Sequence, residues 1–226
     1  MAEPSGPPPD GRATDPDPAR TVPGPADVGP GPRVPDTAGA SDPRPLAALS
    51  GAAADRERWD GRHAVAGPTV AAPPDALRGR ESLLPVSGRM LDVACGRGGV
   101  AVWFARRGWR VDAVDVSPVG LAAGAAAAPQ VTWHVHDLGR GLPVECAGPY
   151  DVVVCQRFRD PALYPALAAA LAPGGLLVLT VLSEVGDTAG PYRAAPGELA
   201  AAFPELEHLA HAERDGQATL LARRGP

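Results

Sequence analysis

The sequence predicts a doubly wound α/β domain whose mostly parallel sheet has seven strands and an antiparallel edge. From residue 88 onward, short apolar runs alternate with Ala- and Leu-rich stretches of helical length. Val-rich runs without polar residues are typical of strands that helices cover on both faces. Near the C-terminus two short runs flank Asp215-Gly216, a pair typical of a tight hairpin turn. We therefore expect parallel strands in the middle of the sheet and an antiparallel hairpin at one edge.

The expected elements follow one another in a regular order along the chain. Strands are expected at 89–93, 110–114, 131–135, 151–155, 176–182, 206–211 and 217–223. Helices are expected at 46–61, 74–84, 98–107, 118–128, 161–171 and 196–203. Gly108 and the Pro173-Gly174-Gly175 turn supply stop signals after two of these helices, since glycine and proline both end helices readily.

The first 45 residues differ in composition from the rest of the chain. They hold 13 of the 28 prolines and no Leu, Ile, Phe, Trp or Tyr. Such a segment cannot bury enough apolar surface to offset the entropy lost on ordering, so we expect residues 1–45 to be disordered. The remainder suits one domain, with a helical cap at 46–87 and the α/β domain at 88–224. We expect deletion of the tail to leave ligand affinity nearly unchanged.

The overall composition excludes several kinds of function. The chain has no Lys, Asn or Ile, and all 21 basic residues are Arg, which indicates a GC-rich bacterial genome and excludes a mechanism that uses a lysine. The formal net charge of −5 at pH 7 predicts no nucleic-acid partner. The sequence shows no signal peptide, no apolar run that could span a bilayer, and no metal-ligand pattern among its three cysteines. We therefore expect a cytoplasmic protein without a metal or a membrane partner.

The segment 90–99, MLDVACGRGG, carries the strongest functional signal. A strand ends in an acid and runs through small residues into a helix, so the backbone can approach a ligand and free N–H groups face it. A tight turn packed without a ligand is the alternative. The spacing Gly96-x-Gly98-x-x-Ala101 also fits a dinucleotide fingerprint, so the glycines alone leave the ligand open.

Acids at three successive strand ends favour S-adenosylmethionine over a nicotinamide or flavin nucleotide. Asp92 stands just before the turn, where it would repel a pyrophosphate but could hold an ammonium group. Asp115, at the end of the second strand, can accept hydrogen bonds from ribose hydroxyls of either cofactor. Asp137 follows the third strand, where a carboxylate can accept a hydrogen bond from an adenine amine. Ammonium, ribose and adenine in this order describe S-adenosylmethionine.

Over about residues 56–224, the chain resembles class I S-adenosylmethionine-dependent methyltransferases of the methyltransferase-domain and tellurite-resistance type. The resemblance rests on LDVACGRGG, RVDAVDVSPVGL, HDL at 136–138, YDVVVCQRF at 150–158 and LAPGGLLVLTVL at 171–182. It implies a Rossmann-like methyltransferase fold with S-adenosylmethionine as cofactor. The turn, with Ala94 where many members have Gly, would wrap the methionine part, and Asp92 would lie near its amine. Cofactor-binding roles are thereby implied for Asp92, Ala94, Cys95, Gly96, Gly98, Asp115 (ribose), Val116 (adenine packing), Asp137 and Leu138 (adenine edge), Cys155 and Gln156.

Upstream, WDGRH at 59–63 resembles the W-D-x-R-Y segment that precedes the glycine turn in this family, with His63 in place of Tyr. The resemblance implies a helix that closes over the cofactor. Candidate residues for the acceptor pocket are Trp59, Arg62, His63, Arg157 and Tyr192.

The sequence identifies no catalytic base. His63 and His136 are candidates, whereas His134 is expected to be a structural strand residue. We expect Cys155 to be a small buried hydrophobe rather than a nucleophile. Arg157 and Arg159 are expected to be solvated loop charges, although they could meet an anionic substrate.

The sequence thus predicts a methyltransferase that moves a methyl group to a small-molecule acceptor by in-line displacement, where positioning supplies much of the rate. The alternative is a non-catalytic S-adenosylmethionine-binding or assembly module with the same fold. A nicotinamide oxidoreductase is disfavoured by Asp92 and Asp137. A nucleic-acid methyltransferase is disfavoured by the low net charge and by Cys155-Gln156-Arg157-Phe158 after the fourth strand. The oligomeric state and the acceptor atom stay open.

Overall fold

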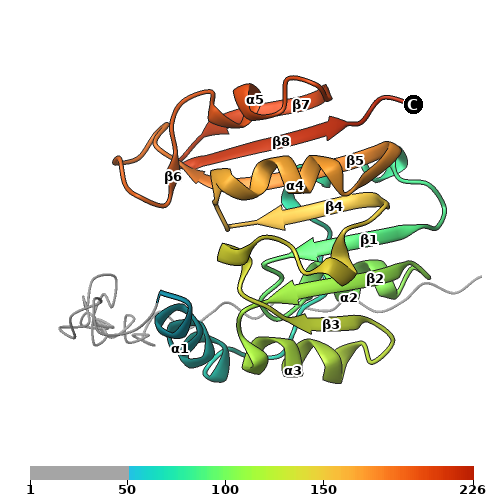
Figure 1. The fold of residues 1–226 in the computed structure, drawn as a ribbon, viewed down its shortest axis with the longest axis vertical. Coiled ribbons are helices and arrows are strands. Elements are labelled where there is room, and N and C mark those ends of the chain that lie inside the picture. The colour runs from blue at the N-terminus through green and yellow to red at the C-terminus, as the bar shows by residue number, and fades with distance from the viewer. Residues whose placement is uncertain (1–50) are drawn as a thin grey trace, which may run out of the picture. The chain divides into compact units, whose positions relative to one another are not determined.

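The computed structural model describes residues 51–226, which build one mixed sheet with helices on both faces (Figure 1). The strand order is β3-β2-β1-β4-β5-β8-β7, and the short β6 pairs with β5 outside this path. Neighbours from β3 to β5 are parallel, whereas β8 is antiparallel to β5 and to β7. The strands are β1 Arg89–Val93, β2 Arg110–Asp115, β3 Thr132–Val135, β4 Tyr150–Gln156, β5 Leu171–Ser183, β6 Arg193–Ala194, β7 Glu207–Arg214 and β8 Gln217–Arg223. The expected doubly wound sheet with an antiparallel edge is confirmed, with β6 as an additional strand.

Two apolar cores lie on the two faces of the sheet. One core packs α4 (Tyr164–Ala169) and α5 (Glu198–Ala202) against side chains from β1, β4, β5 and β8. The other packs α2 (Gly99–Ala105) and the turn η2 (Asp75–Leu77) against the opposite face of the strands. Alternate residues of the central strands therefore face different cores, which is why their sequences are apolar throughout.

The helix α3 (Pro118–Ala127) begins where its sequence predicts. Ser117 is the N-cap, and its hydroxyl accepts a hydrogen bond from the Gly120 N–H at 3.0 Å. Pro118 occupies the first helical position, where its missing N–H costs nothing. This cap fixes the start of α3 directly after the carboxyl end of β2.

The N-terminal cap differs from its expected form between residues 74 and 84. The structure has two short turns there, η2 and η3 (Glu81–Leu83), instead of one helix. Gly79, with φ of 72°, lies between them in the left-handed region and interrupts any continuous helix. Leu77 is nevertheless fully buried, so packing adds to the short-range hydrogen bonds that hold the two turns.

Two boundaries elsewhere also differ from expectation. The helix α4 ends at Ala169, before the Pro173-Gly174-Gly175 turn that was expected to stop it. The strand β5 begins at Leu171 and therefore includes this turn, and its register against β4 shifts between Tyr150 and Val152. The C-terminal hairpin is confirmed, because Asp215 and Gly216 adopt φ of 52° and 72° between β7 and β8.

The remaining helix, α1 (Gly51–Ala64), overlaps the expected helix at 46–61 and extends beyond it. The expectations for residues 1–45 and for the start of that helix lie outside the described residues. Within residues 51–226, no helix combines the length and the apolar character needed to cross a bilayer.

Candidate functional site

The glycine-rich turn connects the carboxyl end of β1 to α2 and has an unusual backbone. Ala94, Gly96 and Gly98 adopt φ of 53°, 56° and 69°, all in the left-handed region. Glycine adopts this conformation at little cost, but a residue with a Cβ atom pays roughly 1–2 kcal/mol. Ala94 is therefore strained, and this strain lies in the turn between β1 and α2.

Asp115, the last residue of β2, is the best-organised acid of the site. Its side chain is only 7% exposed, and its two oxygens accept hydrogen bonds from the backbone N–H groups of Gly96 and Ser117, both at 2.8 Å. These bonds fix the carboxylate between the glycine turn and the start of α3. Each oxygen retains a second lone pair, so a pair of ribose hydroxyls could still donate to it.

Asp92 lies beneath the glycine turn and is 3% exposed. It accepts a hydrogen bond from the Ala101 N–H in α2 at 3.0 Å. Burial raises the pKa of Asp92 to about 7, the Ala101 hydrogen bond opposes this rise, and the charge of Asp115 adds to it. A cation placed beside Asp92 would favour its charged form, which is the chemistry expected of an ammonium-binding acid.

Asp137 follows β3 and begins the short turn η4 (Leu138–Arg140). Its carboxylate accepts a hydrogen bond from the Gly139 N–H at 3.0 Å and lies 3.7 Å from the Arg140 guanidinium. The ends of β2 and β3 are tied together by the His136 N–H, which donates to the Asp115 carbonyl at 2.9 Å. The structure therefore places Asp92, Asp115 and Asp137 at the ends of three neighbouring strands, as the sequence predicts.

The cysteines of the site are not nucleophiles in this fold. Burial is the largest cause that raises the pKa of the Cys95 and Cys155 thiols, and the negative charge of Asp92 adds to the effect at both. The thiolate is the reactive form of cysteine, so both thiols stay protonated and inert. The expectation that Cys155 is a buried hydrophobe is confirmed, since it is 2% exposed.

The end of β4 is tied to the N-terminal cap. The Gln156 side-chain oxygen accepts a hydrogen bond from the Asp75 N–H at 2.7 Å. Arg157 adopts φ of 60° and exposes 73% of its side chain, which confirms its expected solvated character. Its guanidinium lies 3.9 Å from the Asp75 carboxylate.

Arg159 contradicts the expectation of a solvated charge. Its guanidinium donates two hydrogen bonds to the Glu198 carboxylate, at 2.8 and 2.6 Å, and Tyr164 donates a third at 3.0 Å. Such bidentate pairs are the stronger kind of ion pair. The pair joins the loop after β4 to the start of α5, a contact over 39 residues that no local pattern in the sequence signals.

The histidines are already engaged by other groups. His134 lies 3.1 Å from the Asp112 carboxylate, within a cluster where the Tyr150 hydroxyl also donates to Asp112 at 3.0 Å. The structural role expected for His134 is confirmed. His136 contacts the Gly141 carbonyl at 3.1 Å.

The helix α1 is attached to the β2–α3 junction by polar contacts. Asp60 accepts a short hydrogen bond from the Ser117 hydroxyl and another from the Val119 N–H at 3.4 Å. Arg56 donates to the Val116 carbonyl at 3.3 Å, directly beside Asp115. These contacts hold α1 against the part of the site where ribose and adenine are expected.

The C-terminal end of α1 is attached to the glycine turn itself. Arg97 donates to the carbonyls of His63 and Gly67, at 2.6 and 2.7 Å, and so binds the last turn of the helix and the residues after it. The His63 ring packs on the turn, since a Cβ atom built on Gly96 would lie 3.2 Å from its Cε1 atom. Desolvation is the largest cause that lowers the pKa of His63, so the ring is neutral at pH 7.

The proposed acceptor-side residues lie partly on α1 and partly across the sheet. Trp59, Arg62 and His63 lie on α1, and Tyr192 lies in the loop between β5 and β6 with 63% of its surface exposed. Arg58, which the sequence pattern did not single out, joins the two: its guanidinium carbon lies 5.9 Å from the centre of the Tyr192 ring.

The residues present fit S-adenosylmethionine at two of its groups. Asp115 is oriented for a pair of hydroxyls, and Asp92 is a buried acid that a cation would stabilise. The Asp137 carboxylate already accepts a hydrogen bond from the Gly139 N–H in its own turn. A hydrogen bond from the adenine amine, as predicted, would have to use a second lone pair of this carboxylate. Within residues 51–226, no group of three or more His, Cys, Asp or Glu side chains is arranged to hold a metal ion.

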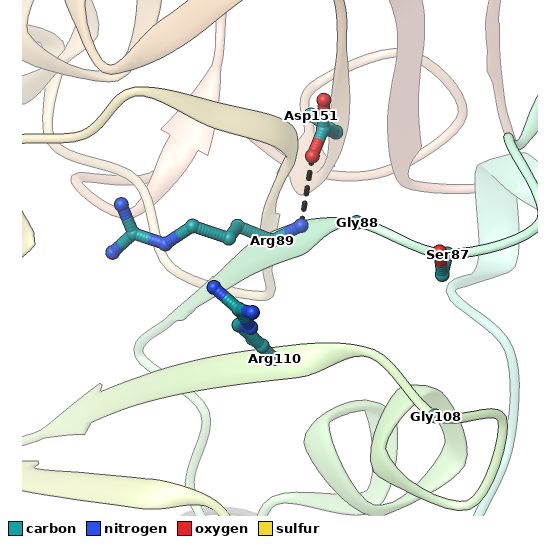
Figure 2. Close-up of a pocket in the computed structure, with 6 residues that line it drawn as sticks. All are labelled: Ser87, Gly88, Arg89, Gly108, Arg110 and Asp151. Atoms are coloured by element: carbon teal, nitrogen blue, oxygen red, sulfur yellow. Dashed lines mark hydrogen bonds between the residues drawn. The ribbon is translucent and has the colours of Figure 1, made fainter.

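A hollow of about 360 Å³ lies at the opposite, amino ends of β1, β2 and β4 (Figure 2). It is lined by Ser87, Gly88, Arg89, Gly108, Arg110 and Asp151. Figure 2 shows Asp151 directed at the backbone nitrogen of Arg89, which donates to it at 2.8 Å. None of the predicted site residues lines this hollow.

Comparison with known sequences agrees with the geometry. Residues 90–175 match the family model described as "Methyltransferase domain". A ubiquinone biosynthesis O-methyltransferase of Xanthomonas axonopodis pv. citri is 35% identical over 111 residues, covering 45% of this chain and 46% of that protein. The protein of the same name from Xylella fastidiosa is 32% identical over 136 residues, covering 56% and 54%. The chain thus spans about half the length of the curated relatives it matches.

Solved structures show the same fold. TehB from Haemophilus influenzae superposes with a TM-score of 0.57 at 18% identity, over 66% of this chain and 61% of that one. The N-methyltransferase NodS from Bradyrhizobium japonicum, in complex with S-adenosyl-l-homocysteine, gives a TM-score of 0.57 at 16% identity, over 76% and 98%. At these identities the likeness establishes the fold alone.

Proposed function

We propose that the chain carries a class I S-adenosylmethionine-dependent methyltransferase domain and that it transfers a methyl group to a hydroxyl oxygen of a small molecule. The observation that carries this proposal is the set of acids at the ends of β1, β2 and β3 around a left-handed glycine turn. An oxygen acceptor is favoured because the relatives above 30% identity are named O-methyltransferases.

In this proposal the chain's residues bind and position rather than react. The cofactor supplies a methyl group on a positively charged sulfur, and the acceptor oxygen attacks it in line. The new bond joins oxygen to carbon, the bonding pair of the old bond stays on sulfur, and the hydroxyl proton leaves to solvent or to a nearby base. Asp115 would hold the ribose and Asp92 the ammonium group, and these contacts would position the cofactor for the transfer.

A non-catalytic binding module remains the second candidate. Arg97 and Asp60 tie α1 to the glycine turn and to the start of α3, and such a closed arrangement would also suit a protein that only binds the cofactor. Both candidates would bind S-adenosylmethionine, so a binding measurement cannot separate them. Methyl transfer to an acceptor separates them, because only the enzyme would carry it out.

The deciding experiment uses the full chain and S-adenosylmethionine with a tritiated methyl group. A panel of phenols, aliphatic alcohols, thiols and amines is screened for label transfer. We expect transfer to hydroxyl compounds that is lost in Asp115→Ala and retained in Asp151→Ala, a matched acid at the other end of the sheet. Label transfer to amines or thiols alone would overturn the choice of oxygen, and cofactor binding without any transfer would favour the binding module.

A further inference from the structure

The ring of His63 lies against the glycine turn of the candidate site. His63 is the second-to-last residue of α1, and its backbone carbonyl accepts a hydrogen bond from Arg97. A Cβ atom built on Gly96 would lie 3.2 Å from the Cε1 atom of the ring and 3.5 Å from its Nε2 atom. A Cβ atom built on Gly120 would lie 2.9 Å from its Cδ2 atom. The ring therefore fills the space that these two glycines leave open between the turn and α3.

Packing fixes the His63 ring but leaves its polar edge unused. The ring of Trp59, one helical turn earlier on α1, stacks on it with a centroid distance of 5.9 Å and an interplanar angle of 23°. His63 is half-buried, and within residues 51–226 no side chain or backbone group forms a hydrogen bond with either ring nitrogen. Polar atoms inside a folded chain usually have a hydrogen-bond partner, so a ring nitrogen held beside the turn without one is suited to a ligand.

Two acids and two arginines act on the His63 ring. Asp60 and Arg62 belong to α1, Arg97 to the glycine turn and Asp115 to the end of β2. The charges of the acids oppose those of the arginines, and burial is the largest influence, which lowers the pKa of His63 from its usual value. The ring is therefore neutral at pH 7, although both acids would stabilise its charged form.

The cofactor would bring two opposite charges to the turn, because its methionine end carries an ammonium group and a carboxylate. Asp92 suits the ammonium group, whereas the carboxylate needs hydrogen-bond donors. The backbone N–H groups of Cys95, Gly96 and Gly98 already donate within the chain, at 3.1, 2.8 and 2.8 Å. The Arg97 guanidinium donates to two backbone carbonyls. The His63 ring is thus a group beside the turn that still has a nitrogen to offer.

The position of His63 connects it to the methionine end of the cofactor. Gly96, on which the ring packs, donates to Asp115, the acid oriented for the ribose. The charge of Asp115 acts on His63 and also on Asp92. A cofactor that contacts both acids therefore lies beside the residue that the His63 ring covers.

We propose that His63 binds the carboxylate of the cofactor as an imidazolium and takes up the necessary proton from solvent when the cofactor binds. No covalent bond between heavy atoms changes: the added proton gives the ring a positive charge, and a ring N–H donates to a carboxylate oxygen. A tyrosine, as in the W-D-x-R-Y segment, could donate a hydrogen bond but would stay neutral near pH 7. The histidine thereby makes cofactor affinity depend on pH. This inference rests on the proposed function, because it assumes S-adenosylmethionine as the cofactor.

Two other roles for the His63 ring lead to different expectations. A general base for the acceptor would stay neutral until the acceptor gives it a proton, so cofactor binding alone would not protonate it. A ring that only packs would take up no proton either, and its loss would weaken every ligand of the turn alike. Proton uptake that depends on the ligand's carboxylate therefore identifies the proposed role.

The test is a calorimetric titration of the full chain with S-adenosylhomocysteine at pH 7.5, in phosphate and in Tris buffer. Because these buffers differ in ionisation enthalpy, the difference in heat counts the protons that binding exchanges. The ligand's amine and Asp92 contribute similarly in the parent chain and in His63→Tyr, so the difference between the two proteins counts the proton of the imidazole. An opposite charge in contact raises a pKa by about 1–3 units, so we expect the parent chain to take up about half a proton more.

The pH dependence of affinity gives a second measurement of the same proton. Binding that takes up a proton is favoured at low pH. The affinity of the parent chain for S-adenosylhomocysteine should therefore fall more steeply between pH 7 and pH 9 than that of His63→Tyr. The tyrosine variant keeps an aromatic ring beside Trp59, so this comparison preserves the packing of α1.

The decarboxylated analogue of S-adenosylhomocysteine, which keeps the amine, assigns the proton to the carboxylate. With this analogue the parent chain and His63→Tyr should exchange equal numbers of protons. His63→Gln should weaken S-adenosylhomocysteine about tenfold and leave the affinity for the analogue unchanged, since only the first ligand loses a charge-assisted hydrogen bond. His211→Gln, which removes a histidine on β7, is the matched control and should behave as the parent chain.

The failures of the two proposals differ in this experiment. If S-adenosylhomocysteine does not bind to the folded parent chain, the proposed function is wrong and this inference falls with it. If it binds and the parent chain takes up no more protons than His63→Tyr, the inference is overturned while the proposed function stands. Equal weakening of S-adenosylhomocysteine and its decarboxylated analogue by His63→Gln has the same meaning, because it would assign the ring to packing alone.

Discussion

The two ends of strands β1, β2 and β4 carry similar residues, glycines beside charged side chains, but they use them differently. At the amino ends Asp151 accepts a hydrogen bond from the backbone N–H of Arg89, and the Arg89 guanidinium pairs with the Asp112 carboxylate at 3.3 Å. The Arg89 guanidinium further stacks on Tyr150 at 4.7 Å. The hollow in Figure 2 is thus the outer side of a closed structural network.

At the carboxyl ends the two most buried acids, Asp115 and Asp92, accept hydrogen bonds from backbone N–H groups. Asp115 holds Gly96 and Ser117, and Asp92 holds Ala101. The backbone between them is strained at Ala94, and α1 lies over the turn. The comparison teaches that glycine and charge alone do not distinguish the two ends; the carboxyl ends differ in having buried acids beside a strained backbone at Ala94.

The largest effect should come from Asp115→Ala. The substitution removes the carboxylate that organises Gly96 and Ser117, and with it the expected ribose contacts. Two hydrogen bonds to a charged group correspond to about 3–6 kcal/mol, so we expect a loss of cofactor affinity of about 100-fold or more. Calorimetric titration with S-adenosylhomocysteine measures it. The matched variant Asp151→Ala should retain the affinity of the parent chain, and equal losses in both variants would remove the distinction between the two ends.

The next effect concerns the pH dependence of stability. Burial raises the pKa of Asp92 in the folded protein to about 7, above its unfolded value near 4. The contribution of Asp92 to the free energy of unfolding is therefore greatest below about pH 4, and it is lost as the pH rises to about 7. The side chain of Asp92→Asn cannot ionise, so this variant should keep its stability as the pH rises. Its loss in free energy of unfolding between pH 4 and pH 8 should be smaller than that of the parent chain by about a few kcal/mol. Urea unfolding of both proteins between pH 4 and pH 8 gives the difference directly. Parallel stability profiles for the two proteins would show that Asp92 does not titrate in this range.

A smaller effect should follow from Gly120→Ala. A Cβ atom at Gly120 would lie 2.7 Å from the Gly96 carbonyl oxygen, so α3 must move away from the glycine turn. Overpacking of this kind costs about 1–3 kcal/mol, and we expect cofactor affinity to fall about tenfold. Gly108→Ala is the control at the amino end: it should reduce stability because φ is 80° there, but it meets no neighbouring atom within 4 Å. Its cofactor affinity should equal that of the parent chain.

The smallest effect should be a gain. Ala94→Gly removes the steric strain of the left-handed backbone at φ of 53°, which raises the free energy of unfolding. Part of this stabilisation is offset because glycine has the greater conformational entropy in the unfolded chain. We expect a net stabilisation of about 0.5–1 kcal/mol in thermal or urea unfolding. A clear destabilisation would mean that the Ala94 methyl group contributes more through its packing than the strained backbone costs.

Sequence alone predicts the parts of this site that depend on local chemistry. The apolar strands, the glycine turn and the acids at 92, 115 and 137 are all readable, because the carboxyl ends of parallel strands meet at one edge of a sheet. Contacts between distant segments are not readable in this way. The Arg159–Glu198 pair and the Asp60–Ser117 bond each join residues whose own surroundings give no hint of the partner.

The N-terminal cap shows the same limit. The expectation of one helix at 74–84 is wrong, because Gly79 divides the segment into short turns, and the burial of Leu77 helps to hold them in place. Arg97 lies between Gly96 and Gly98 in the glycine turn, and its role in holding the end of α1 depends on where the chain returns in space. Its presence between two glycines is the only signal that the sequence offers.

The most direct test of the account is a calorimetric titration of the full chain with S-adenosylhomocysteine, with NADH titrated in parallel. The account predicts one site with a dissociation constant on the order of micromolar for S-adenosylhomocysteine, and no heat from NADH. A folded chain that gives no heat with S-adenosylhomocysteine, or that binds NADH more tightly, would contradict the assignment of the carboxyl-end acids to S-adenosylmethionine.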